Sequence, residues 1–249
     1  MTFHIITIFP DIFSSYVNES ILARAQEKKL ITIHTHDLRR FSIDKHNTVD
    51  DRPYGGGAGM VLMAQPIISA LAEIKSQTTT NKKFQKSNSK TILLSAKGKT
   101  WTQQMARRYA KLDNVVLICG RYEGVDERVK KFVDEEISIG DFVLTGGELP
   151  AMVIVDSVTR LLPGVLGNAE SALSESHNTP HTLEHPHYTR PEVLEVSGLP
   201  TPNGSGKTSK KLRVPKVLLS GNHADIEAWR QKKSKLQAPS NKQITKLKL

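Results

Sequence analysis

The chain has 249 residues, of which 38% are hydrophobic and 24% charged, values typical of a globular protein with a sizeable core. No run approaches the roughly 18–20 consecutive apolar residues needed to span a bilayer, the N-terminus lacks the basic segment of a secretory signal, and Cys119 is the only cysteine. We therefore expect no membrane span and no intrachain disulfide, and a reducing, cytoplasmic location.

The first 165 residues alternate between short apolar runs and segments with helical spacing. Strands are predicted at residues 2–9, 30–35, 91–95, 115–119 and 136–139. Helices are predicted at residues 11–29, 66–74, 100–112, 125–133 and 148–162. Strands separated by helices predict an α/β fold with a parallel sheet covered on both faces. In such sheets ligands bind beyond the carboxyl ends of the strands.

The rest of the chain is poorer in periodic pattern. Polar composition predicts flexible segments at residues 75–90 and 197–209, and a further helix is predicted at residues 222–236. We expect a first domain at residues 1–167, an interdomain segment at 168–190 and a small, mainly helical C-terminal domain at 191–249.

The net charge of +10 is concentrated at one end of the chain. Residues 204–249 contain 12 Lys and Arg against 2 Asp and Glu, while residues 1–203 contain 23 of each sign. A neutral body with a basic tail is typical of a nucleic-acid-binding protein, since phosphate contacts supply most of the sequence-independent affinity. A solvated tail with no partner has the same composition.

Glycine-rich turns are the most informative motifs. They occupy residues 54–59 and 145–150, and between them residues 119–126 combine glycine with Arg121, Tyr122 and two carboxylates. Because glycine has no Cβ, ligand atoms can approach its backbone closely. Several such turns in one chain predict a pocket walled by backbone, of the kind that holds nucleoside-like cofactors.

Three other motifs are weaker. Residues 204–208 read Gly-Ser-Gly-Lys-Thr, but a phosphate-binding loop needs a glycine where Thr201 stands, together with a preceding strand. The sequence 50–54 is equally compatible with a turn carboxylate and with an Asp/Arg pair that faces a ligand. Four histidines could indicate a metal site, but prolines interrupt any helix and no familiar ligand set is complete; we interpret them as solvated or RNA-facing. These are His177, His181, His185 and His187.

Six blocks in order carry a close resemblance to a known family. They are residues 48–60 (TVDDRPYGGGAGM), 119–128 (CGRYEGVDER), 138–152 (SIGDFVLTGGELPAM), 163–167 (PGVLG), 187–191 (HYTRP) and 219–223 (LSGNH). The chain resembles the bacterial tRNA (guanine-N1)-methyltransferases of the TrmD family, within the SPOUT methyltransferases. The resemblance extends from the N-terminus to about Arg230.

The resemblance implies a parallel α/β domain with a deep trefoil knot, a homodimer and S-adenosylmethionine as cofactor, with Mg²⁺ as a further requirement. It implies methylation of N1 of the guanosine at tRNA position 37, next to the anticodon, which supports maintenance of the reading frame. Residues implied to surround the cofactor are Leu94, Ser95, Gly120, Tyr122, Glu123, Ile139, Gly140, Asp141, Phe142, Val143, Leu144, Gly146, Gly147 and Pro150.

The resemblance also implies roles toward the tRNA base. Asp50, Arg52 and the 55–59 glycine loop, which includes Gly59, are implied to place the base. Arg160 is implied to face the guanine O6. The catalytic base of the family is an aspartate; the matching position here is Glu175, one methylene longer. Two alternatives stay open: a related SPOUT enzyme with another target nucleotide, and a non-catalytic RNA-binding relative. The segment 197–213 resembles an insertion, and the chain ends sooner after Trp229 than family members do.

Overall fold

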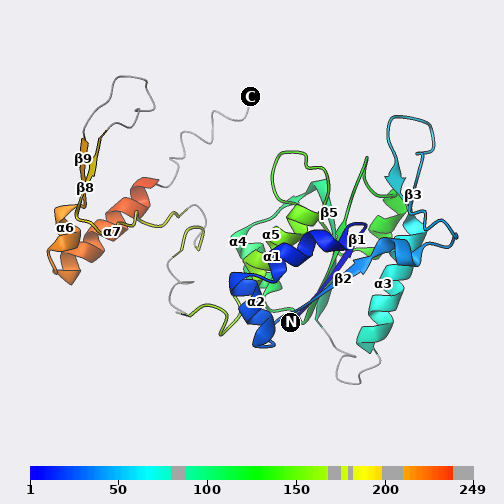
Figure 1. Ribbon diagram of the computed structural model, residues 1–249, viewed down its shortest axis with the longest axis horizontal. Coiled ribbons are helices and arrows are strands. Elements are labelled where there is room, and N and C mark those ends of the chain that lie inside the picture. Colours follow the sequence, from blue (N-terminus) through cyan, green and yellow to red (C-terminus); the bar gives the residue numbers. More distant parts are fainter. Residues whose placement is uncertain (80–87, 168–174, 179–181, 198–209, 238–249) are drawn as a thin grey trace. The chain divides into compact units, whose positions relative to one another are not determined.

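The computed structural model describes residues 1–79, 88–167, 175–178, 182–197 and 210–237 (Figure 1). The chain divides into two compact units, Met1–Ala169 and Glu170–Leu249, each with its own internal packing. In the described parts of the chain, no helix combines the length and the apolar character that a bilayer crossing would need.

The first unit is built on a five-stranded sheet in the order β2-β1-β6-β5-β7. Every neighbouring pair is parallel, as the alternation of strands and helices predicts. Its strands are β1 (Thr2–Thr7), β2 (Thr32–Asp37), β5 (Ser89–Thr100), β6 (Asn114–Cys119) and β7 (Glu135–Ser138).

Helices cover both faces of this sheet, as Figure 1 shows. The α-helices are α1 (Ser14–Val17), α2 (Ser20–Glu27), α3 (Ala64–Thr79), α4 (Gln103–Tyr109) and α5 (Glu148–Thr159). Short 3-10 helices are η1 (Pro10–Phe13), η2 (Leu38–Phe41) and η4 (Glu127–Phe132).

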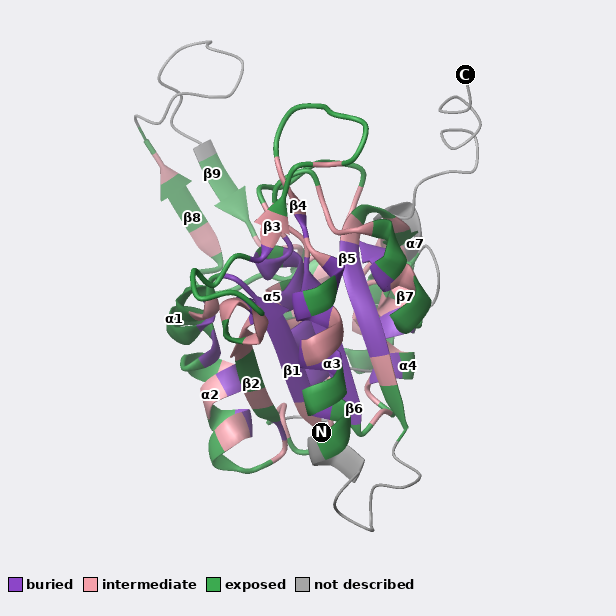
Figure 2. Cartoon of the chain, turned by 90° about the vertical axis from the view of Figure 1, so that its right-hand side faces the viewer, coloured by how far each residue is buried: buried purple, intermediate pink, exposed green. Residues whose placement is uncertain are grey.

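Alternate residues of the central strands enter two separate hydrophobic cores. Phe3 and Ile5 of β1 pack with α2, α4 and α5, whereas Ile6 of β1 packs with α3 and η4 on the opposite face. The same alternation occurs in β6, where Leu117 joins the first core and Ile118 the second. Figure 2 shows these strands buried between their covering helices. Burial on both faces explains why the strands read as continuous apolar runs in the sequence.

The prediction of a single helix at residues 11–29 is wrong. The segment forms η1, α1 and α2 in succession, with Asn18 ending α1 and Glu19 extended at φ −119° and ψ 153°. Phe13, Val17 and Leu22 nevertheless all reach the same core. The apolar spacing therefore indicates that these residues share one buried face. It does not show that the helix is interrupted at Asn18 and Glu19.

Two further predictions need correction. The helix predicted at residues 125–133 is the six-residue 3-10 helix η4, because Asp126 caps it by accepting from the Arg128 N–H and Val133 is already extended toward β7. The flexible segment predicted at residues 75–90 begins as the end of α3 and finishes as the start of β5; residues 80–87 lie outside the described range.

The second unit combines helices with a hairpin. Its helices are α6 (Lys216–Leu219) and α7 (His223–Gln237), and β8 (Val193–Val196) pairs antiparallel with β9 (Lys210–Arg213). The helix expected at 222–236 is confirmed as α7, but the hairpin was not predicted, and β9 lies in the stretch interpreted as an insertion. The 204–208 loop falls outside the described residues.

Candidate active site

A pocket of about 220 Å³ lies where β5, β6 and β7 end and their connecting loops meet. The sequence placed candidate ligand-binding motifs after the same strands. Nearly all residues expected to surround a cofactor line this pocket, and only Gly140 and Asp141 do not. The lining residues from that set are Leu94, Ser95, Gly120, Tyr122, Glu123, Ile139, Phe142, Val143, Leu144, Gly146, Gly147 and Pro150.

Closely packed backbone forms one wall of this pocket. The Gly147 N–H donates to the Gly120 carbonyl over 2.9 Å, which holds the start of α5 against the end of β6. A Cβ built on Gly147 would lie 2.7 Å from the Cys119 Cα, and one on Gly120 would lie 3.2 Å from the Leu94 carbonyl oxygen. Only glycine allows these three backbone segments to approach so closely.

A buried ion pair braces the same turn. The Arg121 Nε donates to the Glu148 Oε2 over 2.9 Å, and the Thr7 hydroxyl donates to the other carboxylate oxygen over 2.8 Å. The Arg121 guanidinium also donates to the Thr145 carbonyl and lies 4.7 Å from the centre of the Phe9 ring. The pair thus ties β1, the loop after β6 and the N-terminus of α5 into one unit.

Glu148 was not singled out from the sequence, and Arg121 was noted only as part of the 119–126 motif. The available signal was their opposite charge within two glycine motifs, at 119–126 and 145–150. Glu148 is 2% exposed, and a buried carboxylate needs partners of this kind.

Four charged side chains on the pocket wall were also missed by the sequence analysis. They are Lys97, Glu127, Lys130 and Glu136. Burial alone would raise the pKa of Glu136, but hydrogen bonds from Ser95 and Lys130 and the lysine charge lower it. Glu136 is therefore ionised, and Lys130 bridges it to Glu127 with contacts of 3.0 and 2.8 Å.

An unusual bulge brings the first of these lysines to the pocket. Leu94 and Lys99 of β5 both align with Ile137 of β7, so that residues 95–98 project out of the strand pairing. At Gly98 a Cβ would collide with the Ile137 backbone. The sequence predicted a strand ending at residue 95 because the bulge interrupts its apolar pattern.

Cys119 ends β6 directly beneath the pocket but has no reactive character. Burial raises the pKa of its thiol well above the ordinary value, and the Glu148 charge adds to the effect. A protonated, buried thiol is a poor nucleophile. The site therefore holds no thiolate nucleophile at Cys119.

The residues expected to place a tRNA base lie on a hairpin joined to the pocket loop. Asp50 is in β3 (Asp50–Asp51), which pairs antiparallel with β4 (Val61–Leu62). The Glu123 N–H donates to the Met60 carbonyl over 3.0 Å, and Leu62 and Gly124 are linked in the same way.

The glycine loop of this hairpin packs against the pocket loop as well. Gly59 has φ +81°, and a Cβ there would lie 2.6 Å from the Glu123 Cγ. Arg52, before the loop, is exposed. The structure thus brings Gly59, at the end of the 50–59 motif, to the edge of the pocket, while the Asp51 carboxylate accepts a hydrogen bond from the Arg52 N–H over 2.7 Å. A role for Asp50 and Arg52 toward a ligand stays a prediction.

The two residues expected to carry chemistry occupy different units. Arg160 directly follows α5, where its N–H donates to the Asp156 carbonyl over 3.1 Å, and its side chain is half-buried. Glu175 belongs to the second unit, is also half-buried, and accepts a hydrogen bond from the Asn178 N–H through its carbonyl.

The histidines singled out from the sequence lie in the second unit, where His177 and His187 are exposed. His185 and His187 lie beside Glu184, while His177 stands apart from them in an exposed turn with φ +64°. His181 is outside the described residues. Glu184 had not been considered as a partner.

A parallel α/β sheet with a backbone-walled pocket at the carboxyl ends of its strands is typical of the class of proteins that bind a small ligand there. Comparison with known proteins identifies which one of this class it resembles. The chain belongs to the tRNA (guanine-1)-methyltransferase TrmD family, whose sequence model matches residues 1–245.

Individual relatives agree with the family match. A tRNA (guanine-N(1)-)-methyltransferase of Caldanaerobacter subterraneus is 49% identical over 234 residues, covering 94% of this chain and 87% of the relative. Proteins of the same name from Clostridioides difficile and Carboxydothermus hydrogenoformans are 47% and 48% identical. These alignments cover 94% and 95% of this chain, and 92% and 83% of the respective relatives.

Proposed function

We propose that this protein transfers a methyl group from S-adenosylmethionine to N1 of the guanosine at position 37 of tRNA, next to the anticodon, and so supports maintenance of the reading frame. The observation that carries the proposal is the coincidence of family and geometry. The chain belongs to the TrmD family over residues 1–245, and three of the six motifs that carry the resemblance, at 48–60, 119–128 and 138–152, meet at one pocket and its adjoining hairpin.

The pocket residues fit a nucleoside cofactor. Apolar side chains of Ile139, Leu144 and Pro150 stand beside the open backbone of Gly120 and Gly146, a combination suited to an adenine ring whose edge needs backbone hydrogen bonds. The 139–144 loop would supply those groups. When bound, S-adenosylmethionine supplies an activated methyl group on a positively charged sulfur.

The size of the pocket supports a compact cofactor and a shared site. Its volume of about 220 Å³ is below the roughly 300–1,000 Å³ of pockets that enclose drug-sized ligands. A bent ligand with one side covered by tRNA or by a partner subunit would fit. Tyr122 and Val143, which line the pocket and are 53% and 86% exposed, would be covered in such an assembly.

The reaction needs a base because guanine N1 carries a proton. We assign this role to the Glu175 carboxylate: it would accept the proton, the N1–H bond electrons would stay on nitrogen, and N1 would form the new bond to the methyl carbon while the carbon–sulfur bond breaks and its electron pair leaves with the sulfur. Negative charge develops toward O6 as the proton leaves. The Arg160 guanidinium would stabilise that charge through its fixed fork of donors.

Glu175 departs from the aspartate of the family by one methylene. The carboxylate chemistry is retained, while the longer side chain changes the backbone position from which the carboxylate can reach N1. Its half-buried setting is compatible with a positioned base.

We also propose that the first unit is knotted. After β7, at the edge of the sheet, the chain returns across the first core to α5, which packs against β1 and β6. On the way, the 145–147 turn is bonded to residues 120 and 121 after β6. A return path held so tightly against an earlier loop supports the trefoil knot implied by the family.

A homodimer would bury the apolar surface that surrounds this return path. Leu149 and Val153 lie one turn apart on α5 and are 55% and 43% exposed. Tyr16 of α1 is 43% exposed and is fixed to α5 by a hydrogen bond of 2.6 Å from its hydroxyl to Asp156. Exposed large apolar side chains on adjoining elements are typical of a protein–protein interface.

The second unit would bind the body of the tRNA. All the net positive charge of the chain falls in residues 204–249, and the described part of this stretch includes the hairpin strand β9 and the helix α7. Lysines and arginines on these elements would contact phosphates. A cytoplasmic location suits both the tRNA substrate and the lone, reduced Cys119.

We propose Mg²⁺ as a further cofactor and assign no protein ligands to it. Among the described residues, the one group of three or more potential ligand side chains contains two histidines, which do not match the oxygen ligands that Mg²⁺ prefers. Mg²⁺ commonly takes most of its ligands from water and substrate phosphates. The tRNA itself would therefore supply most of the coordination.

Incubation with labelled S-adenosylmethionine and unmodified tRNA tests the proposal, using matched tRNAs with guanosine or adenosine at position 37. We expect label only with guanosine, on N1. Label on another nucleotide would indicate a SPOUT enzyme with a different target, and tight tRNA binding without label would indicate a non-catalytic relative.

The Glu175 assignment is tested separately. Glu175→Gln should abolish transfer while cofactor affinity is retained, whereas Glu192→Gln, an exposed position of the same unit, should leave transfer unchanged. Transfer by Glu175→Gln at the rate of the unmodified protein would place the base elsewhere.

A further inference from the structure

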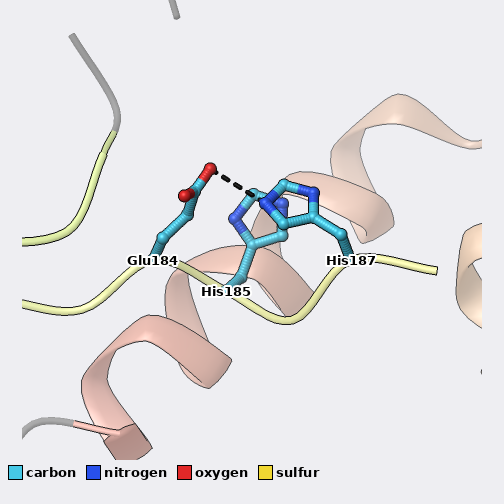
Figure 3. A group of neighbouring side chains, drawn as sticks. All are labelled: Glu184, His185 and His187. Carbon is cyan, nitrogen blue, oxygen red and sulfur yellow. Dashed lines mark hydrogen bonds and ion pairs between the residues drawn. The ribbon is translucent and has the colours of Figure 1, made fainter. Parts of the chain in front are cut away.

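Three potential metal ligands converge in an extended part of the second unit, far in sequence from the pocket loops. Between residues 182 and 189 the chain has no helix or strand. The His187 Nε2 lies 2.9 Å from the Glu184 Oε1, and the rings of His185 and His187 have centroids 4.6 Å apart (Figure 3). One ligand atom from each of the three residues lies within 4.8 Å of the other two.

These separations are close to those of a metal centre. Bonds of about 2.0–2.1 Å in a tetrahedral zinc site place neighbouring ligand atoms about 3.3 Å apart. Side-chain rotation alone could bring Glu184, His185 and His187 to that spacing, because all three side chains are at least partly exposed. Two imidazoles and one carboxylate are a ligand set known from zinc sites with a fourth, open position.

We propose that Glu184, His185 and His187 form a binding site for a divalent transition-metal ion, with Zn²⁺ as the best match. Imidazole ligands favour Zn²⁺ and Cu²⁺ over Mg²⁺ and Ca²⁺. The fourth ligand is water, since the His187 side chain is 66% exposed. The proposal does not depend on the proposed function.

Aromatic side chains of the second unit pack against one side of the Glu184, His185 and His187 cluster. The His185 ring meets the Trp229 ring of α7 edge-on, with centroids 6.3 Å apart, and the Tyr188 ring lies at the same distance from Trp229. Pro186, between the two histidines, restricts the backbone. A bound ion would therefore fasten the 184–187 segment beside α7 and bring a metal close to an indole ring.

The charges nearby do not oppose a cation. Arg230 acts electrostatically on His185, but it lies 3.9 Å from the carboxylate of Glu227, which acts in the opposite direction. Glu184 adds a negative charge directly at the site. The simpler arrangement, a His187–Glu184 hydrogen bond with His185 packed on Trp229, would bind no metal.

Calorimetric titration of the full chain with Zn²⁺ tests the proposal. We expect one Zn²⁺ bound by the unmodified protein, and a loss of affinity of at least about tenfold in His185→Ala and in His187→Ala. His223→Ala, which removes an exposed histidine of the same unit outside the cluster, is the matched control and should bind as the unmodified protein does. Unchanged Zn²⁺ binding in both cluster variants would overturn the proposal.

Trp229 provides a second, local readout. The chain has two tryptophans, so in Trp101→Phe the fluorescence reports Trp229 alone. Cu²⁺ bound by His185 should quench this fluorescence at one equivalent, and adding His187→Ala should shift the quenching to at least about tenfold higher Cu²⁺. Absence of quenching at one equivalent, in protein with an unchanged circular dichroism spectrum, would contradict a site beside α7.

Discussion

The Arg121 guanidinium and the Glu148 carboxylate form a 2.9 Å ion pair in which the glutamate side chain is only 3% exposed and the arginine side chain 18%. The pair joins the loop after β6 to the first turn of α5, and through Thr7 it also reaches β1. Three segments distant in sequence therefore depend on one buried carboxylate, and this dependence leads to the first prediction.

Glu148→Ala should lower the free energy of unfolding by about 3–5 kcal/mol, because it leaves the Arg121 charge without its partner in a largely buried position. Arg108→Ala is the matched control: it breaks the Arg108–Glu135 pair, whose arginine is 55% exposed, and should cost no more than about 1 kcal/mol. Urea denaturation of both variants measures the difference. Equal losses would mean that the buried pair has no special structural role.

Gly147→Ala should weaken cofactor binding strongly. The added Cβ would lie 2.7 Å from the Cys119 Cα and 2.9 Å from the Gly120 N, both backbone atoms that cannot rotate away. The pocket wall must then shift. Gly167→Ala, where a Cβ meets nothing within 4 Å, should bind the cofactor normally. Calorimetric titration with S-adenosylmethionine compares the two, and equal affinities would argue against a cofactor site at this turn.

Arg160→Ala should slow the chemical step by about two to three orders of magnitude, the effect of removing one oxyanion-stabilising donor. Single-turnover rates with saturating tRNA isolate this step from binding. Arg160→Lys should recover part of the rate because it restores the charge without the guanidinium fork. A defect confined to tRNA affinity, with the single-turnover rate intact, would contradict the proposed contact with O6.

Stability should fall in mild acid because of His4. Burial lowers the pKa of His4 to about 4, assisted by the charges of His36 and His34, and the His4 Nδ1 lies 3.1 Å from the His36 Nε2. The pKa of His36 is itself lowered, chiefly by burial and by His34, with Glu73 of α3 opposing and Arg40 of η2 adding to the effect.

Between pH 6.5 and 4 the unfolded chain binds a proton at His4 that the folded chain excludes, so stability is retained above pH 6.5 and is lost as the pH falls. The loss attributable to His4 is about 3 kcal/mol. Denaturation of His4→Gln at pH 7 and pH 4.5 should show a smaller dependence on pH than the unmodified protein. An identical dependence in the two proteins would place the acid sensitivity elsewhere.

Removal of residues 232–249 should weaken tRNA binding and flatten its dependence on salt. This segment contains six lysines and no acidic residue. Each lysine that contacts a phosphate contributes about 0.9 to the slope of log affinity against log salt. Filter binding over a range of salt concentrations measures the slope, with cofactor affinity as the internal control. A slope unaffected by the truncation would make the tail a bystander.

Much of the first unit could be predicted from the chain alone because each buried strand leaves an uninterrupted apolar run. β1 and β6 were expected within two residues of their ends, and the positions of glycine motifs after strands indicated the pocket. The break at Asn18 was not predictable in this way, because Phe13 and Leu22 keep facing one core while the backbone between them changes direction. Likewise, β8 (VLEV) and β9 (KKLR) have only four residues each, too few for a clear alternation.

The sequence by itself determined the α/β class and the loops that form the pocket, since apolar periodicity and glycine spacing are local properties of the chain, and its motifs carried the resemblance to the family. Only the tertiary structure decided that Glu148 meets Arg121 and Thr7, that the 50–59 hairpin lies along the pocket loop, and that Glu184 stands with His185 and His187. Most of these contacts join residues many positions apart, or depend on the path of an irregular segment. Their geometry follows from how the strands and helices pack, and no local pattern records it.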